Sequence, residues 1–117
     1  MSAIPNSGNS KNVKWAKLNA SASGATELVA TTGLGARSKI RVLALALTTT
    51  AENTVSFKSA STVITAAWPL VALGGMVLPF NEHGWFECAV NEALNFNQTV
   101  ATVCGVHIAY TNVDKGG

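Results

Sequence analysis

The sequence predicts an all-β protein, a single-domain antiparallel β-sandwich of about eight strands with a jelly-roll-like arrangement. Three observations support this prediction. Apolar and polar residues alternate with a period of two along most of the chain. Turn-forming residues interrupt the alternation at intervals of about ten residues. No segment shows a helical period that is bounded by capping residues.

The predicted organisation has three parts. Residues 1–12 are a polar N-terminal arm rich in Ser, Asn and Gly, residues 13–113 are the β-sandwich domain, and residues 114–117 are a C-terminal tail. A chain of 117 residues fits one domain. Because 48% of the residues are hydrophobic, the domain can bury a core without disulfide or metal staples.

The first half of the chain predicts three strands. Residues 13–18 and 26–31 are two of them, separated by a turn rich in Ser, Ala and Gly. Residues 39–48 give the clearest pattern of all. Strict alternation divides their apolar side chains between two sides, with Ile40, Val42, Ala44 and Ala46 facing one way and Leu43, Leu45 and Leu47 the other. We therefore expect a central strand whose small alanine side lies against another sheet or subunit.

The rest of the chain predicts six further strands. They cover residues 55–57, 63–68, 76–80, 85–90, 93–99 and 102–111. In the last of them, alternation places four side chains on one face, namely Cys104, Val106, Ile108 and Tyr110.

Residues 60–80 carry no charge and are numerous enough to cross a bilayer. Two prolines and a Gly-Gly pair interrupt this segment, which is rich in Thr and Val. We therefore expect short strands and turns here, and no membrane partner.

Charge is sparse and unevenly distributed. Charged residues make up 12% of the chain, against a usual share of about 25%. Residues 1–58 hold seven basic and two acidic residues, whereas the remainder is mainly acidic. A surface so poor in charge is weakly protected against association, which predicts that partners cover part of it. A nucleic-acid partner is not expected, because it would require a denser basic stripe.

A cysteine-based active site is the first enzymatic hypothesis. Cys88 or Cys104 with His83 or His107 would be a Cys–His pair. Cys104 and His107 are three residues apart, so on one strand they point to opposite faces. The combination of Cys88 with His107 stays open. Otherwise both cysteines are expected to be buried free thiols.

Metal binding and carboxylate catalysis are two further hypotheses. No closely spaced pair of ligands typical of a zinc site is present. Glu82, Glu87 and Glu92 fall in a turn, a strand and the next turn, where solvated positions are expected. The sequence therefore predicts no enzyme, no metal and no cofactor.

The aromatic residues point to a subunit interface. Trp85 and Phe86 are adjacent and face opposite sides of a strand, so one can fill the core while the other must be covered. Trp15 is the third interface candidate. Aromatic side chains exposed together on one face would instead predict a sugar-binding platform.

Five segments resemble small β-sandwich virion proteins of tailed bacteriophages, and most of all their capsid decoration, or cement, proteins. The resemblance spans residues 38–111, and its most specific parts are GGMVLPFN and GWFE. The segments are 39–43 (KIRVL), 55–59 (VSFKS), 74–81 (GGMVLPFN), 84–87 (GWFE) and 92–97 (EALNFN).

The resemblance implies a non-enzymatic jelly roll that forms homotrimers on the outer capsid, assembles in the host cytoplasm and bridges subunits of the major capsid protein. Residues 1–20, with Lys11, Lys14 and Lys17, are the expected capsid contact. Related modules occur in tails and fibres, so a carbohydrate- or receptor-binding module is the alternative function. A Cys-dependent enzyme is the third hypothesis.

Overall fold

The computed structural model describes residues 13–31 and 38–114, which form one β-sandwich of two antiparallel sheets. No helix occurs among these residues. The predicted fold class is therefore confirmed. The strands are β1 (Lys14–Ala20), β2 (Gly24–Val29), β3 (Ser38–Thr49), β4 (Asn53–Ser59), β5 (Thr62–Val63), β6 (Trp68–Leu70), β7 (Gly75–Leu78), β8 (Phe86–Glu87), β9 (Leu94–Gln98) and β10 (Cys104–Asp114).

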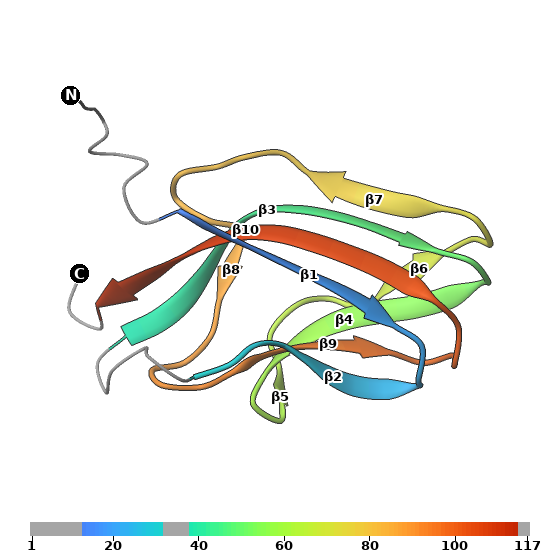
Figure 1. The fold of residues 1–117 in the computed structure, drawn as a ribbon, viewed down its shortest axis with the longest axis horizontal. Helices are drawn as coiled ribbons and strands as arrows, with labels where there is room; N and C mark the ends of the chain where they lie inside the picture. The colour runs from blue at the N-terminus through green and yellow to red at the C-terminus, as the bar shows by residue number, and fades with distance from the viewer. Residues whose placement is uncertain (1–12, 32–37, 115–117) are drawn as a thin grey trace.

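The chain alternates between the two sheets except that β4, β5 and β6 lie consecutively in one sheet and β7 and β8 in the other. The first sheet has the order β1-β10-β3-β7, and β8 pairs with another part of β3. The second sheet has the order β2-β9-β4-β5, and β6 pairs with another part of β4. In Figure 1 the first sheet lies above the second, and the chain crosses from β1 to β2, from β3 to β4 and from β9 to β10. Such alternation is characteristic of a double-sheet jelly roll.

The core lies between the sheets and is rich in aromatic rings. Alternation along β10 turns Val106 and Ile108 inward, as predicted, where both are buried. Phe57 of β4 lies at the centre, with ring centroids 5.1 Å from Phe86 and 5.4 Å from Phe96. Offset and edge-on aromatic pairs of this kind stabilise a core beyond the area that they bury.

The prediction that β3 alternates strictly was wrong, because a β-bulge interrupts it. Ala109 of β10 pairs with Ala44 and Tyr110 pairs with Val42, so Leu43 is an extra residue without a partner. One extra residue reverses the facing of every side chain after it. The core side of β3 therefore holds large residues along its whole length, namely Ile40, Val42, Leu45 and Leu47.

The segment between β4 and β9 is less regular than predicted. Residues 60–80 form the three short strands β5, β6 and β7, and the strand predicted at residues 85–90 shortens to β8. Pro69 lies within β6, an edge strand, where the missing N–H leaves no central ladder incomplete. In the described part of the chain, no helix is long and apolar enough to cross a membrane.

A buried amide network closes one end of the sandwich. Asn53 donates from Nδ2 to Oε1 of Gln98 at 2.9 Å, and its Oδ1 accepts from the backbone N–H groups of Thr99 and Val100 at 3.2 Å each. Gln98 donates from Nε2 to the carbonyl oxygen of Ala22 at 2.9 Å. These bonds tie together the turns after β1, β3 and β9. A buried network in which every amide is paired rigidifies the structure around it.

The ends of the chain fall largely outside this description. The predicted arm, residues 1–12, and residues 115–117 of the predicted tail lie outside the described residues. The first residue of the predicted tail, Asp114, belongs to β10, which pairs with β3 along its full length.

Candidate functional site

The outward side of the first sheet is the most unusual surface of the molecule. We call it the apolar face, and it consists of Trp15, Ala44, Ala46, Val77, Pro79 and Trp85. Trp15 is 67% exposed, Val77 69% and Trp85 43%. Phe80, in the loop after β7, is 56% exposed. Large apolar side chains gathered on one face of a folded domain indicate an interaction site.

A hollow runs along the middle of the apolar face. Its floor is formed by Ala44 and Ala46 of β3, beside the fully buried Ala109 of β10, while Trp15 on β1 and Val77 on β7 rise at its sides. The hollow has a volume of about 340 Å³. Side chains on neighbouring strands stand side by side, so alanines between large residues leave this space empty. The bulge in β3 is what turns Ala44 and Ala46 outward.

The hollow continues into a second, more polar depression of about 350 Å³. Lys17, Asn19, Thr48 and Gly105 line it together with His107. His107 lines both depressions, and its ring packs edge-on against Trp15, with ring centroids 5.8 Å apart. The indole of Trp15 is thereby supported on one side, while most of its surface stays exposed.

The loop between β7 and β8 places Trp85 and Phe86 on opposite sides of the first sheet. Gly84 has a φ of 85°, a conformation that glycine adopts without strain. The backbone N–H of Trp85 donates to the carbonyl oxygen of Val42 at 2.8 Å, and its indole Nε1 donates to that of Pro79 at 2.7 Å. Phe86 packs against the core. Of these two interface candidates, only Trp85 lies on the outer surface.

An ion-pair cluster borders the apolar face at one end. Glu87 binds Nζ of Lys39 at 2.8 Å and Nε of Arg41 at 2.9 Å. The hydrogen bond from Lys39 is the main cause that holds the pKa of Glu87 below its usual value, and the bond from Arg41 adds to it, while partial burial opposes both. Among the described residues Lys17 has no ion-pair partner, so it is the unpaired charge within the face.

The lysines predicted to contact the capsid do not form one patch. Lys11 lies outside the described residues. Lys14 and Lys17 are both exposed on β1, but their spacing of three residues turns them to opposite sides of the strand. Lys14 donates to Oδ1 of Asn112 at 2.8 Å, whereas Lys17 lies beside His107 on the outward side of the sheet.

The two cysteines are buried and free, as predicted. Burial raises the pKa of the Cys88 thiol to about 11, so it is a neutral, weak nucleophile near pH 7. Cys104 accepts a hydrogen bond from Asn53 and faces away from His107, as the spacing predicts. The N–H of Cys88 bonds to residue 40 of β3, and His107 pairs with residue 46. That separation of about 20 Å along the strand excludes a direct Cys88–His107 pair.

The carboxylates are likewise dispersed. Glu87 is held by the ion-pair cluster, Glu92 accepts a hydrogen bond of 2.5 Å from the hydroxyl of Ser59, and Glu82 is exposed in a turn beside His83. The described residues contain no group of three or more His, Cys, Asp or Glu side chains that could hold a metal ion.

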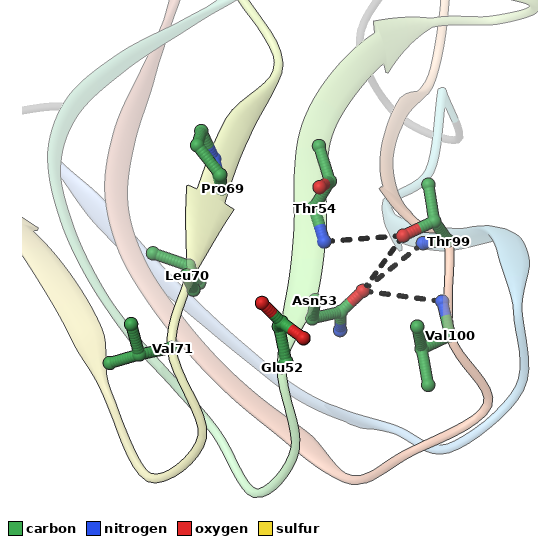
Figure 2. Close-up of a pocket in the computed structure, with 8 residues that line it drawn as sticks. All are labelled: Glu52, Asn53, Thr54, Pro69, Leu70, Val71, Thr99 and Val100. Carbon is green, nitrogen blue, oxygen red and sulfur yellow. Dashed lines mark hydrogen bonds between the residues drawn. The ribbon is translucent and has the colours of Figure 1, made fainter.

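One further cleft, of about 440 Å³, lies at the end of the sandwich that the amide network closes. Figure 2 shows that the side chain of Asn53 is engaged there by Thr99 and Val100. Glu52 is its one ionisable lining residue. Among the described residues that line the cleft, the amide of Asn53 is already paired and no second ionisable group is present.

No protein-family model, curated protein or solved structure matches this chain. The resemblance to phage decoration proteins stays a prediction. The geometry of the apolar face is the physical basis on which a function can be proposed.

Proposed function

We propose that this protein is a non-enzymatic structural protein of a tailed-phage virion, a capsid decoration protein that binds the major capsid protein and stabilises the head. The observation that carries the proposal is the apolar face. A protein that functions by binding another protein keeps large apolar side chains exposed at its binding surface. The five segments of resemblance supply the virion setting.

The construction of the domain supports a bracing role. β10 pairs with β3 from Cys104 to Asp114, so the two longest strands form an antiparallel ladder through the first sheet that only one bulge interrupts. The buried network around Asn53 and Gln98 fixes the turns at one end. A shell protein that resists outward pressure benefits from such a rigid body, because little of the binding free energy is then lost in ordering it.

Lys14 and Lys17 point to opposite sides of β1, but β1 is an edge strand, so both can supply the proposed contact with an acidic capsid surface that meets this edge. Lys14 and Lys17 are both exposed, and Lys11 precedes them in the sequence. Exposed charges at the rim of an interface mainly raise the rate of association and make it sensitive to salt.

Binding to empty, expanded capsids that lack this protein tests the proposal. Purified protein should co-sediment with them saturably, and mass spectrometry should detect it in virions. The double variant Lys14→Glu, Lys17→Glu should bind about tenfold more weakly at low salt. Lys58→Glu, on the outward side of β4, is the matched control. Absence of binding by the unaltered protein would reject the proposal.

A carbohydrate- or receptor-binding module of a tail or fibre is the second candidate. The position of the exposed Trp15 ring beside Lys17, Asn19 and His107 favours it, because an indole face and nearby polar groups can hold a sugar. This function predicts saturable binding on a glycan array that Trp15→Ala abolishes. A flat array would reject it.

A further inference from the structure

We infer that the apolar face pairs with the apolar face of a second copy of this chain, with Trp15 of each copy inserted into the hollow of the other. The inference goes beyond capsid binding, because it assigns the apolar face to the pair and leaves the edge of β1 for the capsid contact. It replaces the trimer that the resemblance implies with a two-fold pair.

The chemistry of the hollow selects an apolar occupant. Apart from the indole of Trp15, His107 alone among its lining residues has a polar group in its side chain, and the floor consists of alanine methyl groups. A sugar or a charged ligand placed there would leave most of its polar groups without partners, which costs free energy. An aromatic ring would instead exchange water for close apolar contact.

The same face carries a side chain that suits this space. Trp15 stands at the edge of the hollow on β1, is 67% exposed, and is braced by His107 from one side. A buried aromatic side chain covers about 150–250 Å². Because the projecting ring and the hollow face the same way, one two-fold rotation satisfies both copies at once.

The size of the face fits a reversible pair. Its strands β1, β10, β3 and β7 hold 7, 11, 12 and 4 residues. At about 3.3 Å per residue and about 4.8 Å between strands, they cover roughly 540 Å². Two copies would therefore bury about 1,100 Å² in total, which is at the low end of specific interfaces and typical of a pair that dissociates on dilution.

The charges of the face permit this pairing. Glu87 binds both Lys39 and Arg41, which moderates the charge at that end. Lys17 lies on the edge strand β1, where its ammonium group can extend to solvent while the stem packs.

Sedimentation velocity of the full chain over a concentration series tests the inference. The unaltered protein should sediment as a dimer that dissociates on dilution. Ala46→Arg fills the floor of the hollow and should weaken the dimer at least about thirtyfold, and Trp15→Ala should act in the same direction. Ala25→Arg, which alters an exposed alanine on the outward side of β2, is the matched control and should leave the dimer unchanged. Circular dichroism and unfolding curves check that each variant folds.

Several results would overturn the inference. They are a protein that stays monomeric up to about 1 mM, a stable trimer, or equal effects of Ala46→Arg and Ala25→Arg. A monomer whose tryptophan fluorescence shifts on adding chitohexaose or maltohexaose would also overturn it, in favour of glycan binding. A dimer that fails to bind capsids would support the pairing and reject the decoration role, and a monomer that binds capsids would do the reverse.

Discussion

The two outer faces of the sandwich differ in the polarity of the side chains that they expose to water. On the second sheet the outward side chains are mostly polar, and several bond to one another or to the backbone. Asn95 donates to the carbonyl oxygen of Ala60 at 2.8 Å, and Asn97 donates to the hydroxyl of Ser56 at 3.3 Å. On the first sheet the corresponding positions hold alanines flanked by Trp15 and Val77, both more than half exposed.

This difference indicates that the residues that stabilise the fold and the residues available for association are largely distinct. Both sheets bury their inward side chains in one core, so the fold does not require an apolar surface on either outer side. The outer face of the second sheet exposes mainly polar side chains to water, whereas the outer face of the first sheet exposes apolar area that a partner can cover. Changes on the apolar face should therefore alter assembly with little effect on unfolding, except where they touch the backbone of the sheet.

The largest expected effect comes from such a backbone contact, at Gly75. A Cβ added to Gly75 would lie 2.2 Å from the carbonyl oxygen of Leu47, which forces β7 away from β3. We expect Gly75→Ala to lower the free energy of unfolding by roughly 2–3 kcal/mol, as overpacking does. Urea unfolding followed by tryptophan fluorescence measures it.

Gly105 is the control for this prediction, because it lies on the same face. A Cβ there would meet only side-chain atoms of Asn19 and Thr48, both at 3.5 Å. Gly105→Ala should raise the free energy of unfolding by about 0.5–1 kcal/mol, since alanine loses less backbone entropy in a strand. Equal losses for both variants would show that β7 is not held against β3 as described.

A second prediction contrasts a fully buried asparagine of the second sheet, Asn53, with a partly buried one on its outer face, Asn97. Asn53→Ala leaves the N–H of Val100 and Oε1 of Gln98 without their partners, which should cost about 3 kcal/mol. Asn97→Ala removes one bond on the outer face and should cost less than about 1 kcal/mol. The same urea experiment compares them, and similar costs would contradict the central role of the amide network.

Much of this fold could be predicted from the sequence because alternation survives in it. The period along β10 assigns its inward residues correctly, and turn residues mark most strand ends. The bulge at Leu43 could not be predicted, because β3 is apolar on both sides at this point. The sequence pattern therefore does not show which residue is left without a partner. The effect of the bulge was to exchange the facing of Ala44 and Leu45.

The candidate surface was predictable only in part. The adjacency of Trp85 and Phe86 shows that one of them must point outward. Alternation places Lys17 on the side of Trp15 and Lys14 on the other side, so it does not show that Trp15 is exposed. The hollow depends on which residues of β3, β7 and β10 stand side by side, and that register is a tertiary property. Val77 was therefore missed.

The third prediction concerns the pH dependence contributed by Cys88 behind the ion-pair cluster. Its thiol has a pKa of about 11, against 9.0 for an unperturbed thiol, mainly because it is buried. A raised pKa in the folded state gives stability that is complete below about pH 9 and is lost as pH rises toward 11. Relative to Cys88→Ala, the unaltered protein should lose stability across this interval. Parallel curves for the two proteins would contradict the shift.

The smallest effect is expected at Glu87, where the apolar face ends in charge. Its lowered pKa gives stability that is complete above pH 4.5 and is lost as pH falls through the folded-state pKa. Glu87→Gln should therefore cost about 1 kcal/mol at pH 7 and nothing at about pH 2, in keeping with a partly exposed pair. Glu27→Gln, on the outward side of β2, is the control and should change stability by less than about 0.5 kcal/mol at either pH. If Glu87→Gln and Glu27→Gln had equal effects, the ion pairs of Glu87 would add no stability. The outer faces of the two sheets would then differ only in exposed apolar area.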